Sequence, residues 1–196
     1  MSYFKRDKRA YILLADGTIF KGYNFGCEGT TIGEIVFTTG MTGYQEVLTD
    51  PSYYGQIVMQ TYPLIGNYGV NGDDMESEKS WVAGYIVKEW CEEPSNFRKA
   101  GTINEFLTAQ GKIGIWDIDT RALTRRIREH GTMNGCITTE DVYANKAALL
   151  KKIQDYKVVN PVQKVTSLEK GWYYTRENRA NHVALMDYGY KHNILH

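Results

Sequence analysis

The chain has 196 residues, with 23 Lys and Arg against 23 Asp and Glu, so its formal net charge is zero. This length allows one large domain, or one domain plus part of another, with room for an apolar core. Hydrophobic residues make up 42% of the sequence and charged residues 23%, which excludes disorder as the main state. The apolar runs are far shorter than the roughly 20 residues of a membrane-spanning helix. Balanced charge also disfavours a nucleic-acid partner.

The N-terminus and the cysteines predict a cytoplasmic protein. Residues 1–9 are basic, and no apolar run of signal-peptide length follows them. Cys27, Cys91 and Cys136 are odd in number and widely spaced, so neither a disulfide framework nor a zinc site is indicated. We expect all three to be packing thiols.

The first part of the chain predicts mainly strands. Residues 11–15 and 18–23 flank Asp16-Gly17, which favours a hairpin with a two-residue type I′ turn. Residues 33–39 and 56–62 are rich in β-branched residues and predict two more strands. Between them we expect a short helix over residues 42–49, in which Thr42 and Gln45 form a capping box. Asp50-Pro51 must end it, so residues 50–52 form a defined loop.

The rest of the chain alternates loops, strands and helices. Residues 63–74 predict a long ordered loop, which is often functional. The expected strands are residues 81–87, 113–116, 133–138 and 182–189. The expected helices are residues 102–107, with Thr102 and Glu105 as a capping box; 120–130, capped by Asp119; and 140–154, with Val142, Ala147, Leu150 and Ile153 facing inward. Residues 156–180 predict a polar, irregular connector.

This order of elements predicts an α+β domain over residues 1–155, followed by a linker over residues 156–181. The last predicted strand is different, because its apolar run is continuous. Such a strand suits a parallel sheet covered by helices on both faces, and no residues after 196 are present to supply those helices. Residues 182–196 are therefore predicted to be the truncated start of an α/β domain.

No catalytic group is predicted from the residues alone. None of the three cysteines has the flanking glycines of a nucleophile elbow. His192 and His196 are four residues apart, a spacing that can bind a metal on a helix, but they have no intervening glutamate and lie at a terminus, so we expect no metal site.

Basic residues gather in the predicted helix over residues 120–130. Arg121, Arg125 and Arg128 share one face of it. Two interpretations stay open: phosphate or nucleic-acid contact, and a solvated face or protein interface. Balanced overall charge favours the second.

Four ordered motifs carry a family resemblance. Residues 33–53 contain Gly-Glu-Ile-Val-Phe-Thr-Thr-Gly-Met-Thr-Gly-Tyr-Gln-Glu-Val-Leu-Thr-Asp-Pro-Ser-Tyr, and residues 61–69 contain Thr-Tyr-Pro-Leu-Ile-Gly-Asn-Tyr-Gly. Residues 117–125 and 187–194 follow in order, the last reading Asp-Tyr-Gly-Tyr-Lys-His-Asn-Ile. Together these motifs resemble the small subunit of carbamoyl phosphate synthetase over nearly the whole chain.

The resemblance implies a three-layer β/β/α N-terminal domain, followed by the start of an α/β class I glutamine amidotransferase domain. In that family a Cys-His-Glu triad hydrolyses glutamine. A larger synthetase subunit uses the ammonia, with bicarbonate and ATP, to make carbamoyl phosphate. This chain lacks the triad, so we expect no glutaminase activity from it alone. It is expected to need no cofactor, because ATP and magnesium belong to the partner subunit. The resemblance leaves open whether the product enters arginine or pyrimidine synthesis.

Two glutamine-binding residues are implied by the resemblance. Ser52 matches a serine that hydrogen-bonds glutamine across the domain interface, and Lys191 matches a lysine near the substrate carboxylate. The alternatives are that Ser52 bonds only its own turn and that Lys191 is simply solvated. The N-terminal domain would then shape the glutamine site and the contact with the large subunit. A separate alternative is a free-standing adaptor or nucleic-acid-binding module that uses the Arg121–Arg128 helix.

Overall fold

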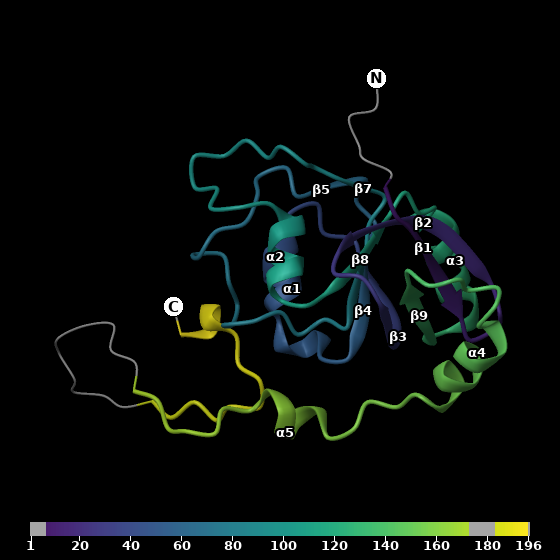
Figure 1. The fold of residues 1–196 in the computed structure, drawn as a ribbon. Coiled ribbons are helices and arrows are strands. Elements are labelled where there is room, and N and C mark those ends of the chain that lie inside the picture. Colours follow the sequence, from purple (N-terminus) through teal and green to yellow (C-terminus); the bar gives the residue numbers. More distant parts are fainter. Residues whose placement is uncertain (1–6, 173–182, 196) are drawn as a thin grey trace.

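The computed structural model describes residues 7–172 and 183–195 (Figure 1). Within these residues, seven strands close into a barrel in the order β1-β2-β8-β6-β4-β3-β9. They are β1 (Arg9–Leu14), β2 (Ile19–Gly26), β3 (Thr30–Thr38), β4 (Gln56–Gln60), β6 (Gly84–Ile86), β8 (Ile113–Trp116) and β9 (Met133–Thr138). Neighbours β3, β4, β6 and β8 pair in parallel, and the remaining pairs are antiparallel.

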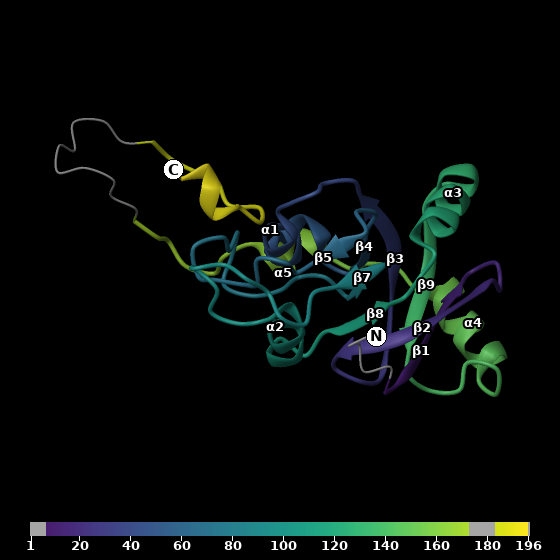
Figure 2. The same cartoon turned by 90° about the horizontal axis from the view of Figure 1, so that it is seen from above.

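The other elements surround this barrel. Two short parallel strands, β5 (Leu64–Ile65) and β7 (Glu89–Trp90), form a separate sheet. The α-helices are α1 (Tyr44–Thr49), α2 (Ile103–Ala109), α3 (Thr120–His130), α4 (Lys146–Asp155) and α5 (Pro161–Val165), and the 3-10 helices are η1 (Pro51–Tyr53) and η2 (His192–Ile194). Figures 1 and 2 show α1 and α2 on the side of the barrel away from α4. None of these helices has the length and apolar character needed to span a bilayer.

Alternation along the strands fills the barrel interior. Ile12 and Leu14 of β1 point inward, where they pack with Ile35, Ile57 and other side chains that are almost fully buried. Leu123 and Ile127 of α3 belong to the same cluster, so α3 packs against this interior core. Removing this apolar surface from water is the main force that closes the barrel.

Apolar residues also cover the outer face of the barrel. On one side, Leu48 of α1 and Leu107 of α2 pack with Val58, Tyr85 and Trp116 of the strands. On the other side, α4 packs on β1 and β9 through a separate cluster. That cluster contains Leu13, Cys136, Val142, Leu149 and Ile153. The α+β class is thus confirmed, and the main sheet is one closed barrel.

Local sequence signals predicted the first hairpin and two helix caps, but not the type of turn in the hairpin. The predicted hairpin is present, but only Gly17 has a positive φ, and its amide donates to the carbonyl oxygen of Leu14. The turn is therefore a type I turn followed by a glycine bulge, and the type I′ prediction was wrong. The capping box of Thr102 and Glu105 and the Asp119 cap of α3 are both confirmed.

Long-range contacts override the predicted cap of α1. Gly43, not Thr42, is the N-cap residue, and it adopts a left-handed conformation without a side-chain cap. Its amide donates instead to the Tyr68 hydroxyl at 2.8 Å. Tyr68 lies in the loop after β5, and Gln45 holds this loop too: its Oε1 accepts from the Asn71 amide at 2.9 Å. The predicted capping box at Thr42 and Gln45 was therefore wrong.

Three further predictions need correction. The connector predicted to be irregular over residues 156–180 contains a short helix, α5. The last helix of the barrel domain begins at Lys146 rather than residue 140, because the Asp141 carboxylate bonds the amides of Tyr143 and Ala144 in a preceding turn. Of the positions predicted to face inward, Val142 and Ile153 are buried and Leu150 is partly buried, whereas Ala147 is exposed and Leu149 is buried instead.

The predicted strand over residues 182–189 is absent from its described part, residues 183–189, and His182 lies outside the described residues. A strand needs hydrogen-bonded neighbours, and the described residues supply none to this segment, in which Val183 is 94% exposed.

Gly22→Ala tests the close approach of two barrel strands. A Cβ at Gly22 would collide with the carbonyl oxygen of Trp116 and lie 2.9 Å from Ile118 Cδ1. We expect the free energy of unfolding in urea to fall by about 1–3 kcal/mol, as in other overpacked cores. The matched control is Gly72→Ala, where a Cβ meets nothing within 4 Å. An equal loss of stability in both variants would contradict this account of barrel closure.

Candidate functional site

A tight turn after α1 presents Ser52. Asp50 caps η1, and its Oδ1 accepts from the Ser52 amide at 2.8 Å. Pro51 follows with its φ fixed by the ring, and its side chain is buried. The Tyr53 and Tyr54 amides then donate to the carbonyl oxygens of Asp50 and Pro51. The local sequence Asp-Pro-Ser-Tyr therefore fixes the backbone on both sides of Ser52.

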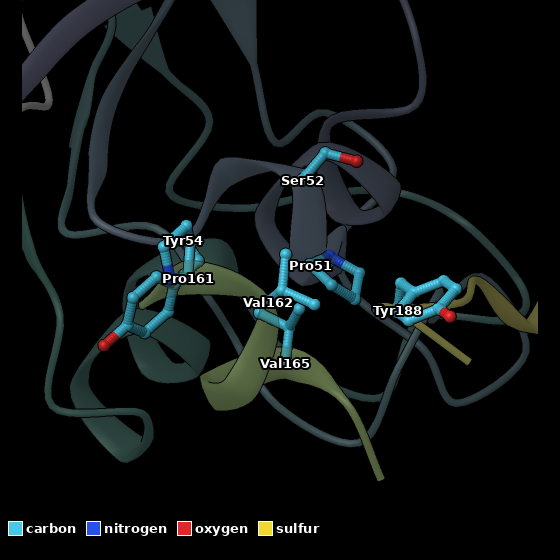
Figure 3. Close-up of a pocket in the computed structure, with 8 residues that line it drawn as sticks. Pro51, Ser52, Tyr54, Pro161, Val162, Val165 and Tyr188 are labelled. Atoms are coloured by element: carbon cyan, nitrogen blue, oxygen red, sulfur yellow. The ribbon is translucent and has the colours of Figure 1, made fainter. Parts of the chain in front are cut away.

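The Ser52 side chain is exposed. Figure 3 shows its hydroxyl pointing away from Val162 and Val165 of α5. No described residue hydrogen-bonds this hydroxyl, whereas the backbone amide of Ser52 is bonded to Asp50. The turn thus uses the serine backbone and leaves its hydroxyl available to another molecule.

The segment over residues 187–195 docks against this turn. The Asp187 carboxylate bonds the amides of Gly189 and Tyr190 through Oδ1 and that of Ser167 through Oδ2. Burial raises the pKa of Asp187, but these hydrogen bonds outweigh it and lower the pKa to about 2. Gly189 has a positive φ, and a Cβ there would lie 2.6 Å from Val165 Cγ2. A compact turn therefore starts the segment.

Two carboxylates hold the rest of the segment. Lys191 Nζ donates to Asp50 Oδ2 at 2.9 Å, and this hydrogen bond raises the pKa of Lys191. Asn193 Nδ2 donates to Glu76 Oε1 at 2.8 Å, and the His192 amide donates to the Glu76 carbonyl oxygen. Lys191 and Ser52, far apart in the sequence, are therefore both bonded to Asp50.

A cavity of about 190 Å³ lies beside the turn (Figure 3). Its lining residues come from the turn, α5 and the C-terminal segment, and they are Pro51, Ser52, Tyr54, Pro161, Val162, Val165, Tyr188 and Gly189. None of them carries a charged side chain. An amino acid ligand has a charged carboxylate and a charged amine, which need paired partners when buried. We therefore interpret the cavity as a gap between packed segments and place the candidate site at the Ser52 hydroxyl and the Lys191 ammonium.

The sequence missed two residues of this region. Asp50 was predicted only as a turn former, although the same motif that contains Ser52 contains it. Glu76 lies in a stretch without periodicity, so no sequence signal could have found it. Among the described residues, no group of three or more His, Cys, Asp and Glu side chains is placed to hold a metal ion, and His196 lies outside these residues.

The arginine helix is only partly paired. Arg126 Nε donates to Asp16 Oδ2 at 2.6 Å. Arg121, Arg125 and Arg128 are exposed, and no described carboxylate lies within ion-pair distance of them. This face is solvated in the described chain and is free to contact another protein.

Comparison with known proteins identifies the family. The model of the carbamoyl-phosphate synthase small chain, CPSase domain, matches residues 12–137. The chain belongs to this family.

Relatives named carbamoyl phosphate synthase small chain show how much of the family's length is present. The protein from Oceanobacillus iheyensis is 47% identical over 188 residues, which are 96% of this chain and 50% of the relative. The protein from Aquifex aeolicus is 45% identical and covers 96% of this chain and 54% of its own length. The protein from Solidesulfovibrio magneticus is 59% identical over 67% of this chain and 35% of its own length. The chain therefore spans about half the length of these small chains.

Asp187→Ala should loosen the start of the docked segment. The Gly189 and Tyr190 amides lose their acceptor, so we expect both to exchange hydrogen faster in NMR. In the unchanged chain, the folded pKa of Asp187, about 2, lies below its ordinary value of 3.8. The protection is therefore complete above about pH 4 and is lost as the pH falls through 2. The control is Asp155→Ala, an exposed carboxylate at the end of α4, and equal exchange in both variants would contradict the docking role.

Proposed function

We propose that this chain is the part of a glutamine-hydrolysing carbamoyl phosphate synthetase small chain that shapes the glutamine site without supplying the nucleophile. The parent small chain releases ammonia from glutamine. The large synthetase chain then uses that ammonia, with bicarbonate and ATP, to make carbamoyl phosphate. The observation that carries this proposal is the Asp50 carboxylate, which bonds both the Ser52 amide and the Lys191 ammonium.

The two side chains fit complementary parts of glutamine. A serine hydroxyl can both donate a hydrogen bond to a polar amino acid ligand and accept one from it. An ammonium can pair with the α-carboxylate, which needs a cationic partner when water is excluded. Ser52 comes from the barrel domain and Lys191 from the docked segment. In this proposal, glutamine binds where these two parts of the chain meet.

The segment from residue 182 onward is proposed to open the amidotransferase domain, after a linker over residues 156–181. Val183 and Met186 are exposed apolar residues in this part, and the rest of the relatives' length is proposed to cover them. The Cys-His-Glu triad is placed in that same remainder.

The cysteines of this chain suit packing roles. Cys136 is buried, and burial raises the pKa of its thiol to about 11. A nucleophilic cysteine needs the opposite shift. Cys27 Sγ bonds the Thr108 carbonyl oxygen, and no described thiol is hydrogen-bonded to a histidine. The chain alone is therefore proposed to be inactive, and ATP and magnesium are assigned to the large chain.

The remaining proposals concern partners and location. The exposed face formed by Arg121, Arg125 and Arg128 is a candidate contact with an acidic surface of the large chain, because arginine pairs bidentately with carboxylates. The protein is proposed to act in the cytoplasm, where the substrates bicarbonate, ATP and glutamine are available to the paired chains.

Ser52→Ala tests the proposed glutamine site in the complete small chain paired with its large chain. Loss of the hydroxyl removes one hydrogen bond to glutamine, so we expect the KM for glutamine to rise on the order of tenfold. Synthesis supported by added ammonia should be unchanged, because it bypasses the glutamine site. Steady-state kinetics with each nitrogen source measure both quantities.

The control for this substitution is Ser95→Ala, which removes an exposed hydroxyl from a different loop. It should leave both KM values unchanged. An equal loss of glutamine-dependent and ammonia-dependent synthesis in Ser52→Ala would show general damage and overturn the assignment.

The 196-residue chain should release no ammonia from glutamine above the buffer rate. The reason is that its described thiols lack an activating histidine, and a thiol rather than a thiolate is a weak nucleophile. A coupled ammonia assay measures the rate, and the complete small chain with its large chain serves as the positive control. Ammonia release above the buffer rate would contradict the proposal if it is lost in Cys91→Ser, because the thiol of Cys91 would then be acting as a nucleophile.

A further inference from the structure

The Asp50 carboxylate has an unusual position between two parts of the chain. Its side chain is only 12% exposed, and its two oxygens have different partners. Oδ1 accepts from the Ser52 amide at 2.8 Å, and Oδ2 accepts from Lys191 Nζ at 2.9 Å. These partners belong to the turn after α1 and to the docked segment, which are joined through a long stretch of chain.

We propose that Asp50 is the positioning residue of the glutamine site, acting through Ser52 and Lys191. This inference rests on the proposed function and adds a residue to it. One oxygen fixes the backbone that carries the Ser52 hydroxyl, and the other fixes the ammonium of Lys191. Asp50 therefore sets the relative placement of two groups that contact different parts of the substrate. A misplacement of about 1 Å in such a pair is enough to weaken a site strongly.

A carboxylate is the group that this geometry requires. It offers two acceptors and a negative charge, and both acceptors are used here. An asparagine at position 50 keeps one acceptor for the Ser52 amide. Its second polar atom is an NH₂ donor, which would face the Lys191 ammonium and repel it. Asp50→Asn therefore separates the two roles: the turn remains bonded while Lys191 loses its partner.

The competing explanation is that Asp50 only docks the C-terminal segment. Glu76 provides the comparison, because it docks the same segment from a buried position. Glu76 is 8% exposed, and its Oε1 accepts from Asn193 Nδ2 at 2.8 Å. Glu76 forms no hydrogen bond or ion pair with Ser52 or Lys191 among the described residues, although its charge also helps to raise the pKa of Lys191. A change that depends on docking alone should therefore follow from Glu76→Gln as well as from Asp50→Asn.

The kinetic test uses the complete small chain with its large chain. We expect Asp50→Asn to raise the KM for glutamine on the order of tenfold, as for loss of a charged hydrogen bond, with kcat and ammonia-dependent synthesis little changed. Glu76→Gln should change the KM less than about twofold. In the double variant Asp50→Asn/Lys191→Met, the KM should be no higher than in Lys191→Met alone, because Asp50 acts through Lys191. The thermal unfolding midpoint of each variant separates site effects from misfolding.

Three kinetic results would overturn the inference. The first is an Asp50→Asn effect that multiplies with that of Lys191→Met. The second is an equal rise of the KM in Glu76→Gln. The third is a parallel loss of ammonia-dependent synthesis in Asp50→Asn. Each would mean that Asp50 docks or folds the chain without positioning Lys191.

A second measurement needs no enzyme activity. Competitive acetylation of the 196-residue chain, read by mass spectrometry, compares the labelling rate of Lys191 with that of the exposed Lys170. We expect the ratio to rise several-fold in Asp50→Asn and to rise clearly less in Glu76→Gln, because Glu76 acts on Lys191 through its charge alone. If this rise occurs but Asp50→Asn leaves the KM of the complete enzyme for glutamine unchanged, the ion pair between Asp50 and Lys191 is supported and the proposed function fails. If the ratio does not change in Asp50→Asn, the positioning role fails whatever the enzyme does.

Discussion

The structure depends on strands that are apolar on both faces. A strand directs successive side chains to opposite sides, so β1 can place Ile12 inside the barrel and Leu13 against α4 outside it. The interior cluster closes the barrel, and the outer clusters recruit the helices. Because both faces are buried, a slip of one residue would exchange the two sets of side chains. This constraint fixes where each strand ends, and hence where the loops that carry the site begin.

The polar network around α1 transmits that order to the site. The last turn of α1 leaves carbonyl groups without helical partners, and Ser77 and Ser80 donate to the carbonyl oxygens of Thr49 and Leu48. Thr49 in turn accepts from the Glu76 amide through its hydroxyl. One helix end therefore leads directly into the Asp50 turn and also places Glu76. The two carboxylates that hold the C-terminal segment are set by the same few residues of backbone.

The sequence predicted most features that arise from neighbours in the chain, although the predicted turn type at Asp16-Gly17 was wrong. The capping box at Thr102 and the Asp119 cap could be predicted because each bond spans three residues. The Gly43 cap could not, because its partner is Tyr68 from a distant loop. Strands β5 and β7 were missed for a related reason: each has two residues, too few for a periodic pattern. Within the site, the motifs indicated Ser52 and Lys191, but no local rule indicates that one carboxylate joins them across the chain.

The bonds of Asp50 show how the described part of the chain orders the groups of the proposed glutamine site. A site is strong when its groups are placed before the ligand arrives, because the ligand then does not have to order them. In the described chain, the Ser52 backbone, the Asp187 turn and the Lys191 ammonium are all bonded to protein. The Ser52 hydroxyl has no such partner. Placement is thus supplied by backbone and carboxylate bonds, while a group suited to recognition stays exposed. In the proposed function, a nucleophile from the rest of the small chain would meet a wall that is already ordered.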